Sequence, residues 1–388
     1  MPSGLEEFAA NIPSTLRQAR IGLCCNPTAV DRRLRHAVEI LPQAGLTIHR
    51  LFGPEHGVYA AAQDMITVEN EGPEVVSLYG DDEASLHPSP ESLADLDVLI
   101  FDIQDIGARY YTYQATLGFI MEVAGKVGTK VIVLDRPNPI NGIDLEGNVV
   151  LPGFESFVSA YPLAVRHGMT MGEMAHYFHR YCGIDCDFEV VQCTGWERHQ
   201  WFDETDLPWV LPSPNMPTLD TAIIYPGMCL IEGTNLSEGR GTTRPFHLVG
   251  APWLDPERFA TLCRQGAADS GLSGVGFRSA SFEPRFQKHA GALCGGVEVH
   301  VTDRNALESY LLGLVVVEAA MRCDPEHFGW RTETYEYVDD PIAIDLLCGT
   351  SEARVGLESK VSPRDLIDSW AAPRADWAQK RERCLLYR

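Results

Sequence analysis

The chain contains 388 residues, of which 45% are hydrophobic and 22% charged, a composition typical of a globular protein with a substantial buried core. It carries 54 acidic against 31 basic residues, and its formal net charge of −23 argues against binding nucleic acid or anionic lipid through a broad electrostatic surface. No uncharged apolar run reaches the length of a membrane span, so we expect no membrane segment.

The amino terminus and the cysteines both favour a cytoplasmic protein. Residues 1–20 include Glu6 and Glu7 and lack an apolar core of signal-peptide length, as expected of a cytoplasmic protein or of a mature form without its signal. The 11 cysteines are scattered and include no CxxC pair, which favours reduced thiols over a disulfide framework. One loose group of histidines and cysteines matches no zinc spacing, so we expect no metal at His176, His179, Cys182, Cys186 and Cys193.

Strand and helix patterns alternate through the first half of the chain. Strands are predicted at 21–25, 46–52, 75–78, 98–102, 130–134 and 188–193. Helices are predicted at 31–44, 114–127 and 170–181, the last with Thr170 and Glu173 as a capping box. The near-continuous apolar run at 98–102 is typical of a central strand covered on both faces. This alternation implies right-handed crossovers and a parallel sheet.

The second half alternates less regularly and predicts a separate, smaller domain. A helix is expected at 256–265, strands at 276–282 and 296–301, a helix at 305–321, and a charged helical tail after that. The length of the chain also favours two domains. We place the boundary near residues 246–253, which gives an α/β domain over 1–246 and an α+β domain over 247–388.

The stretch LFGPEHG at residues 51–57 delivers two reactive side chains to the end of the second strand. Gly53 and Pro54 end the strand, and Glu55 and His56 follow. Open α/β sheets bind ligands at the carboxyl ends of their strands. Cleavage of a glycosidic bond needs a carboxylic acid kept protonated near neutral pH, a role that suits Glu55. The alternative is that Glu55 and His56 form a solvated turn.

A second polar stretch follows the central strand. Asp102 and Asp105 are candidates for a second catalytic carboxylate, although carboxylates at strand ends also hold loops. Arg109 could pair with a carboxylate of a sugar whose apolar face stacks on Tyr110, Tyr111 and Tyr113. The alternative is that two of the three tyrosines belong to the core. We take Glu55, His56 and Asp102 as the predicted catalytic set, and Asp105 with Arg109, Tyr111 and Tyr113 as predicted substrate-binding residues.

Further binding candidates lie on later loops. Arg136 and Asn138 in DRPNP suit either ligand contact or a loop held by an Asp–Arg pair, and His167 suits either a site or a satisfied loop. Asn215 lies in the proline-rich loop PSPNMP. The glycine-rich segment 229–246 would let backbone N–H groups approach an anion. It lacks the lysine of a phosphate-binding P-loop, and its predicted ligand-binding side chains are Glu232, Asn235, Arg240 and Arg244.

Several of these stretches occur together in a known order. They are LFGPEHG, SLYG at 77–80, DVLIFDIQDIGARYYTY at 97–113, VIVLDRPNP at 131–139, RHGMTMGE at 166–173, PSPNMP at 212–217 and LIEGTNLSEGRGTTRPF at 230–246. In this combination the chain resembles the exo-β-N-acetylmuramidases, bacterial cell-wall recycling enzymes long catalogued as a domain of unknown function. The resemblance covers most of the first two-thirds of the chain.

The resemblance implies a Rossmann-like, mostly parallel sheet with a smaller α+β C-terminal domain and no nucleotide cofactor. It implies release of N-acetylmuramic acid from the non-reducing end of peptidoglycan fragments, with Glu55 as the catalytic acid. The lactyl carboxylate of that sugar needs a cationic partner, for which we expect Arg240, Arg244 or Arg109. Residues 58–61 and 26–29 depart from the family pattern, which bears on substrate range more than on reaction class.

Some alternatives stay open on the sequence. Retention and inversion both fit, and the acetamido group of the substrate could itself be the nucleophile. A nucleotide-cofactor enzyme is disfavoured because no GxGxxG follows the first strand. A non-catalytic saccharide-binding protein is the remaining alternative. A homodimer is compatible with the sequence, which does not require one.

Overall fold

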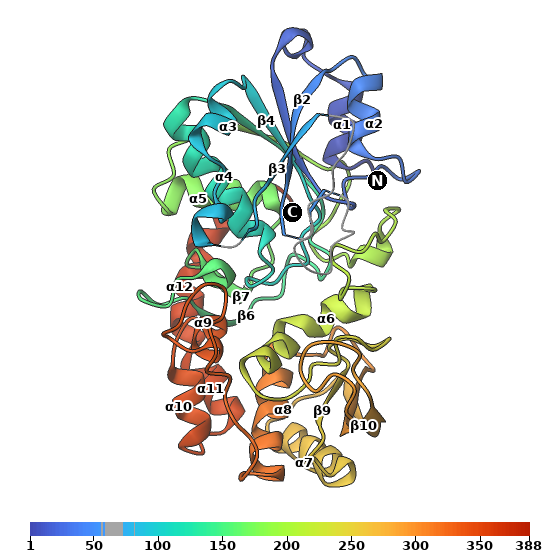
Figure 1. Ribbon diagram of the computed structural model, residues 1–388, viewed down its shortest axis with the longest axis vertical. Coiled ribbons are helices and arrows are strands. Elements are labelled where there is room, and N and C mark those ends of the chain that lie inside the picture. The colour runs from blue at the N-terminus through green and yellow to red at the C-terminus, as the bar shows by residue number, and fades with distance from the viewer. Residues whose placement is uncertain (56, 59–72, 81) are drawn as a thin grey trace.

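The computed structural model covers residues 1–388 and describes all of them except residues 56, 59–72 and 81. A sheet with helices on both faces forms one end of an elongated molecule, and a second group of helices and strands forms the other (Figure 1). Among the described residues, no helix is both long and apolar enough to cross a bilayer.

The first domain is built on a six-stranded sheet in which every pair of neighbouring strands is parallel. Its strands, in chain order, are β1 (Ile21–Cys25), β2 (Ile48–Gly53), β3 (Glu74–Ser77), β4 (Val98–Asp102), β5 (Lys130–Leu134) and β8 (Phe188–Val191). The spatial order β3-β2-β1-β4-β5-β8 reverses direction between β1 and β4. In such sheets the ligand crevice lies at this reversal, outside the carboxyl ends of the strands. The predicted parallel α/β sheet is confirmed.

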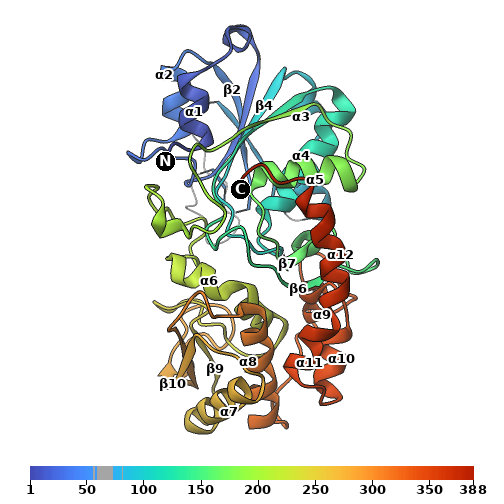
Figure 2. The same ribbon diagram turned by 180° about the vertical axis from the view of Figure 1, so that it is seen from behind.

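Helices cover both faces of this sheet, as Figures 1 and 2 show from opposite sides. On β4, Leu99 and Phe101 pack into one hydrophobic cluster, whereas Val98 and Ile100 pack into another. Successive strand residues point to opposite faces, so both faces of β4 are buried. One face is covered by α1 (Gly4–Ala10) and α2 (Ala37–Gln43), and the other by α3 (Pro90–Ala94), α4 (Tyr113–Val127) and α5 (Met171–Tyr181).

Local sequence accounts for two helix starts. The predicted capping box of α5 is present, with the Thr170 side chain accepting from the Glu173 backbone and the reverse bond also made. The helix predicted from residue 31 begins only at Ala37, because the Asp31 carboxylate accepts backbone N–H bonds from Arg33 and Arg35 and holds a loop instead.

The second domain combines an antiparallel sheet with helices, which confirms the smaller α+β region. Its strands β9 (Leu248–Ala251), β10 (Val275–Phe282) and β11 (Cys294–Val301) lie in the order β10-β11-β9. Gly227 and Gly313 allow two of its helices to touch, since a Cβ on Gly227 would lie 1.7 Å from the Ser309 carbonyl oxygen. The helices are α6 (Leu219–Met228), α7 (Pro256–Asp269), α8 (Ser309–Cys323), α9 (Ala343–Cys348), α10 (Glu352–Glu358), α11 (Pro363–Ser369) and α12 (Ala371–Glu382).

The excursion between the two halves carries a small antiparallel pair, β6 (Glu146–Val149) and β7 (Ala164–Arg166). Short 3-10 turns complete the structure at Ser14–Gln18, Glu83–Leu86, Phe157–Ser159, Phe202–Glu204 and Cys229–Gly233.

The end of the chain returns to the first domain. Helix α12 runs back beside β6, and the C-terminal residues lie near the sheet (Figure 1). Arg381 Nε donates to the carbonyl of His167 (2.9 Å), and Tyr387 Oη donates to Asp135 Oδ2 (2.6 Å). The two domains are therefore joined by this returning arm as well as by the chain around residue 220.

Candidate active site

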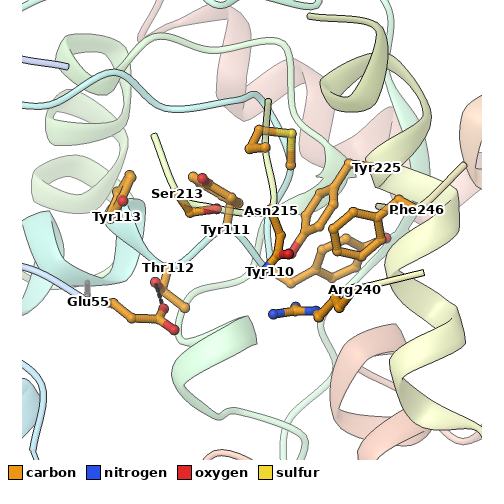
Figure 3. Close-up of a pocket in the computed structure, with 11 residues that line it drawn as sticks. Glu55, Tyr110, Tyr111, Thr112, Tyr113, Ser213, Asn215, Tyr225, Arg240 and Phe246 are labelled. Atoms are coloured by element: carbon orange, nitrogen blue, oxygen red, sulfur yellow. Dashed lines mark hydrogen bonds between the residues drawn. The ribbon is translucent and has the colours of Figure 1, made fainter. Parts of the chain in front are cut away.

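A cavity lies where the carboxyl end of the parallel sheet meets the second domain. Figure 3 shows Glu55 and Thr112 on one side and Arg240, Tyr225 and Phe246 on the other. The lining residues are Glu55, Tyr110, Tyr111, Thr112, Tyr113, Ser213, Asn215, Met216, Tyr225, Arg240 and Phe246.

Glu55 reaches the cavity because β2 ends two residues before it, at the sheet edge where ligand crevices form. The hydroxyl of Thr112 donates a hydrogen bond to Glu55 Oε2 (2.8 Å), and Thr112 is the N-cap residue of α4. This bond fixes the direction of the carboxyl group. His56, the second predicted catalytic residue of this loop, lies outside the described residues.

Aromatic rings form one wall of the cavity. Tyr111 and Tyr113 are 8% and 2% exposed, and their rings meet edge to face with centroids 5.1 Å apart. Tyr225 continues the wall, and its ring centroid lies 5.6 Å from that of Tyr111 and 4.8 Å from that of Phe246. The two interpretations of the tyrosines therefore both apply, since the rings are buried in the protein and also line the cavity. Such a wall suits the apolar face of a sugar ring.

Arg240 lies across the cavity from Glu55 and beside Phe246, within a cluster of buried charges. Its Nη2 donates to Glu232, and its Nε lies 3.1 Å from Glu238 Oε1. Lys288 Nζ lies 3.1 Å from the other oxygen of Glu238. Burial opposes the charge on Arg240, but Glu232 and Glu238 outweigh it and raise the pKa of the guanidinium. The pKa of Glu232 is lowered because Arg240 outweighs the cost of burial. The cluster fixes Arg240 in place at the cavity wall.

Asp102 and Arg136 form a buried ion pair that does not line this cavity. Asp102 is completely buried, and its two carboxylate oxygens accept from Nε and Nη2 of Arg136. The same Nη2 also donates to the carbonyl of Val30 (3.1 Å). All these groups are paired within the protein, so the geometry disfavours Asp102 as a catalytic group and Arg136 as a sugar ligand. It matches the alternative interpretation, a loop held by an Asp–Arg pair.

Arg109 is directed away from the cavity. Its Nη1 donates to the carbonyls of Asn148 and Leu163 (2.8 and 2.9 Å), and its Nη2 donates to the carbonyl of Leu347 (2.7 Å). The side chain is 0% exposed, and burial lowers its pKa. Because its terminal nitrogens are occupied by backbone of the excursion and of α9, the geometry disfavours Arg109 as a partner of a substrate carboxylate.

Asp105, Asn138 and His167 belong to a buried network. Asp105 Oδ2 accepts from the Gly107 N–H (2.7 Å) and lies 3.5 Å from His167 Nε2. His167 Nδ1 accepts from the Met169 N–H, and Asn138 donates to the Met169 carbonyl (3.0 Å). The structure therefore brings these predicted residues together, but it places them behind the cavity wall, where they hold loops.

The other candidates differ in placement. Asn215 lines the cavity. Asn235 donates to the carbonyl of His327 (2.7 Å) and accepts from the Gly329 N–H, so its amide holds a loop of the second domain. Arg244 is 38% exposed and lies 3.5 Å from Glu298. Neither Asn235 nor Arg244 is among the lining residues.

Sequence reasoning did not assign several lining residues. Thr112, Ser213, Met216 and Phe246 all occur inside quoted motifs, which were read only for their charged, amide and tyrosine side chains. Tyr225 lies on α6, a helix that the periodicity did not predict. A search for aromatic and hydroxyl side chains within the motifs would have found Thr112, Ser213 and Phe246, but neither Met216 nor Tyr225.

Within the described part of the chain, no group of three or more His, Cys, Asp or Glu side chains has an arrangement that could hold a metal ion. All 11 cysteines are free thiols, and all but Cys182 are buried.

Comparison with known proteins identifies relatives over nearly the whole chain. Residues 21–220 match the family model for exo-beta-N-acetylmuramidase NamZ, N-terminal, and residues 223–387 match the corresponding C-terminal model. These models divide the chain at α6, upstream of the boundary predicted near residues 246–253. The chain is 41% identical over 393 aligned positions to peptidoglycan beta-N-acetylmuramidase NamZ of Bacillus subtilis (strain 168), covering 99% of this chain and 91% of that protein.

Solved structures with the same architecture include two DUF1343 family proteins from Bacteroides fragilis NCTC 9343. One superposes with a TM-score of 0.87 at 32% identity, and the other with a TM-score of 0.77 at 27% identity. Each alignment covers 100% of this chain and 99% of the other.

Proposed function

We propose that Glu55 is the general acid with which this chain, a member of the exo-β-N-acetylmuramidase NamZ family, cleaves its glycosidic bond. Membership follows from family models that span residues 21–220 and 223–387 and from 41% identity to a peptidoglycan β-N-acetylmuramidase. The chain is a glycoside hydrolase that releases N-acetylmuramic acid from the non-reducing end of peptidoglycan fragments.

The observation that supports this role is the position of the carboxyl group. Among the described residues that line the cavity, Glu55 carries the only carboxyl group. The hydroxyl of Thr112 holds one of its oxygens in a fixed direction. A general acid must come within hydrogen-bond reach of the leaving oxygen, and a carboxyl group fixed at the cavity wall supports that role.

The remaining lining residues suit the terminal sugar. The rings of Tyr111, Tyr113 and Tyr225 offer an apolar wall for one face of the ring. We infer that Arg240, the cationic side chain among the described lining residues, pairs with the lactyl carboxylate. Its charge is partly balanced by Glu232 and Glu238, so the fork geometry contributes more than net charge.

Glu55→Gln tests the acid. With a natural disaccharide of N-acetylmuramic acid and N-acetylglucosamine, we expect kcat to fall by about 10²–10⁴-fold, because the leaving oxygen no longer receives a proton. With a 4-nitrophenyl glycoside of N-acetylmuramic acid, whose leaving group needs little protonation, the loss should be much smaller. Equal losses on both substrates would contradict a general acid and indicate a role in binding or in attack.

Arg240→Lys tests recognition of the lactyl carboxylate. This change keeps the positive charge but removes the planar fork, and we expect the preference for N-acetylmuramic acid over N-acetylglucosamine glycosides to fall. Arg244→Lys is the matched control, because it makes the same change on a side chain outside the cavity lining. An unchanged preference in Arg240→Lys would remove Arg240 from substrate recognition.

A further inference from the structure

A tight turn in the second domain carries a carboxyl group that the sequence motifs do not include. Tyr335 and Val338 exchange two backbone hydrogen bonds, of 2.9 and 3.0 Å. The two residues between them, Glu336 and Tyr337, both have positive φ, 46° and 68°. Turns of this kind favour Gly and Asn, because a Cβ is crowded in this backbone conformation. Glu336 and Tyr337 must therefore be held there by their surroundings.

The turn is held by both domains. Tyr335 Oη donates to Glu232 Oε2 (2.9 Å). The other carboxylate oxygen of Glu232 accepts from Arg240. Tyr337 Oη donates to the carbonyl of Gly80 (2.6 Å), just after β3. The ring centroids of Tyr337 and Tyr79 are 6.1 Å apart. Glu336 lies between these two anchors, so its position depends on the junction of the two domains where the cavity is found.

The carboxyl group of Glu336 is buried and close to other carboxyl groups. Its Oε2 is inaccessible to solvent and has no hydrogen-bond partner among the described residues. Burial, and then the negative charges of Glu55 and Glu232, raise the pKa of Glu336 to about 8. Arg240 and Arg331 act in the opposite direction without outweighing them.

The other titratable groups around Glu336 are tyrosines. Burial is the largest cause of the raised pKa of Tyr79, Tyr335 and Tyr337, and the charge of Glu336 adds to it in each case. These hydroxyls therefore stay protonated through the neutral range. The proton that can move at this junction belongs to the carboxyl groups.

We propose that Glu336 is a positioning residue that shares one proton with Glu55 at the junction of the two domains. This inference rests on the proposed role of Glu55. Two carboxyl groups that sense each other's charge do not both ionise near neutral pH, so the pair keeps one proton. The Thr112 hydroxyl donates to Glu55 Oε2, so this oxygen acts as an acceptor. The neighbouring carboxyl group of Glu336 keeps a proton available for the leaving oxygen.

The proton balance of hydrolysis closes with this pair alone. The pair gives its proton to the glycosidic oxygen as the bond between that oxygen and the anomeric carbon breaks. Water then adds its oxygen to the anomeric carbon. The proton that the water releases returns to the pair, which is thereby restored for the next turnover.

The test is the pH dependence of kcat/KM on the disaccharide of N-acetylmuramic acid and N-acetylglucosamine. In Glu336→Gln we expect the basic limb of the pH profile to move to lower pH by roughly one unit or more. An uncharged amide at this position no longer opposes loss of the proton that the two carboxyl groups share. Glu333→Gln is the matched control, since it makes the same change three residues away on an exposed side chain. Its limb should coincide with that of the unmodified protein.

The possible results separate the two proposals. If Glu336→Gln leaves the basic limb in place, or abolishes the hydrolysis of both the disaccharide and a 4-nitrophenyl glycoside while the protein stays folded, proton sharing is wrong. If Glu55→Gln is fully active on the disaccharide, the proposed acid itself fails, whatever Glu336→Gln does. Should Glu336→Gln not fold, Glu336→Asp replaces it. Its shorter acid weakens the coupling and should move the limb in the same direction by less, and an unmoved limb overturns the inference.

Discussion

Two buried ionic regions lie near the carboxyl edge of the sheet, and they differ in charge balance. Asp102 and Arg136 pair one carboxylate with one guanidinium through two hydrogen bonds. Around Arg240, by contrast, the carboxyl groups outnumber the cations once Glu55 and Glu336 are counted. A balanced buried pair orders loops, whereas an excess of carboxyl groups retains a proton near neutral pH. Charge balance therefore separates the structural region from the reactive one.

The largest effect is expected from breaking the balanced pair. Asp102→Ala leaves the Arg136 guanidinium buried without its partner, and we expect the free energy of unfolding to fall by about 3–5 kcal/mol. Denaturant unfolding measures the loss. The kcat of the molecules that remain folded should be unchanged.

A double variant sharpens that result. Replacing both partners, with Asp102→Leu and Arg136→Met, removes the unpaired charge and should recover most of the lost stability. A large fall in kcat in Asp102→Ala, without a fall in stability, would instead return Asp102 to the catalytic set.

A smaller effect is expected from the carboxyl-rich region, and it depends on pH. The pKa of Glu336 is raised from 4.5 in the unfolded chain to about 8 in the fold, so the folded protein holds the extra proton. Stability should fall as pH rises from about 5 to 9, and Glu336→Gln should remove this fall. The difference in unfolding free energy at pH 9 should be about 1–3 kcal/mol after allowance for solvent screening, and it should vanish near pH 4.

Melting curves of the two proteins across this range measure the difference. Glu333→Gln serves again as the control, because its side chain is exposed and should give parallel curves at every pH. A Glu336→Gln protein that is less stable at pH 9 than the unmodified chain would contradict a buried, protonated carboxyl group.

The smallest effect concerns one hydrogen bond in the reactive region. Thr112→Val keeps the shape of the side chain but removes the 2.8 Å bond to Glu55. We expect kcat/KM to fall about tenfold, since one bond to a carboxyl group contributes roughly 1.5 kcal/mol. Thr116→Val is the control, because its hydroxyl donates to the Thr112 carbonyl (3.3 Å) and the residue does not line the cavity. Equal losses in the two variants would assign the effect to the helix.

The strands could be predicted because their signal is local. Residues 21–25, 98–102 and 130–134 are apolar runs, and the structure gives β1, β4 and β5 these same limits. Helix α6 was not predicted, since Pro226 lies inside it and it is apolar on nearly every side, with no period to detect. The late start of α2 depends on the side-chain bonds of Asp31, which periodicity does not report.

The site was predictable in part, for a physical reason. Glu55, Tyr111 and Asn215 reach the cavity because they follow strands or form rigid loops at the sheet edge. Arg109 shares a motif with Tyr111, yet its guanidinium is used by backbone carbonyls that are distant in sequence. Pattern alone does not say whether a charged side chain is already satisfied. Glu336 carried no signal, because its turn lacks the glycine that usually marks one.

The returning arm has a consequence for the order in which the protein is completed. Leu386 donates its N–H to Glu173 (2.8 Å), and Tyr387 bonds Asp135, 252 residues earlier in the chain. During translation the ribosome makes the whole second domain between these partners. Domains usually fold in order of emergence. Here the domain that emerges first receives these buried donors only after the second has been synthesised, so a nascent chain carries an unfinished first domain until the second domain has been made.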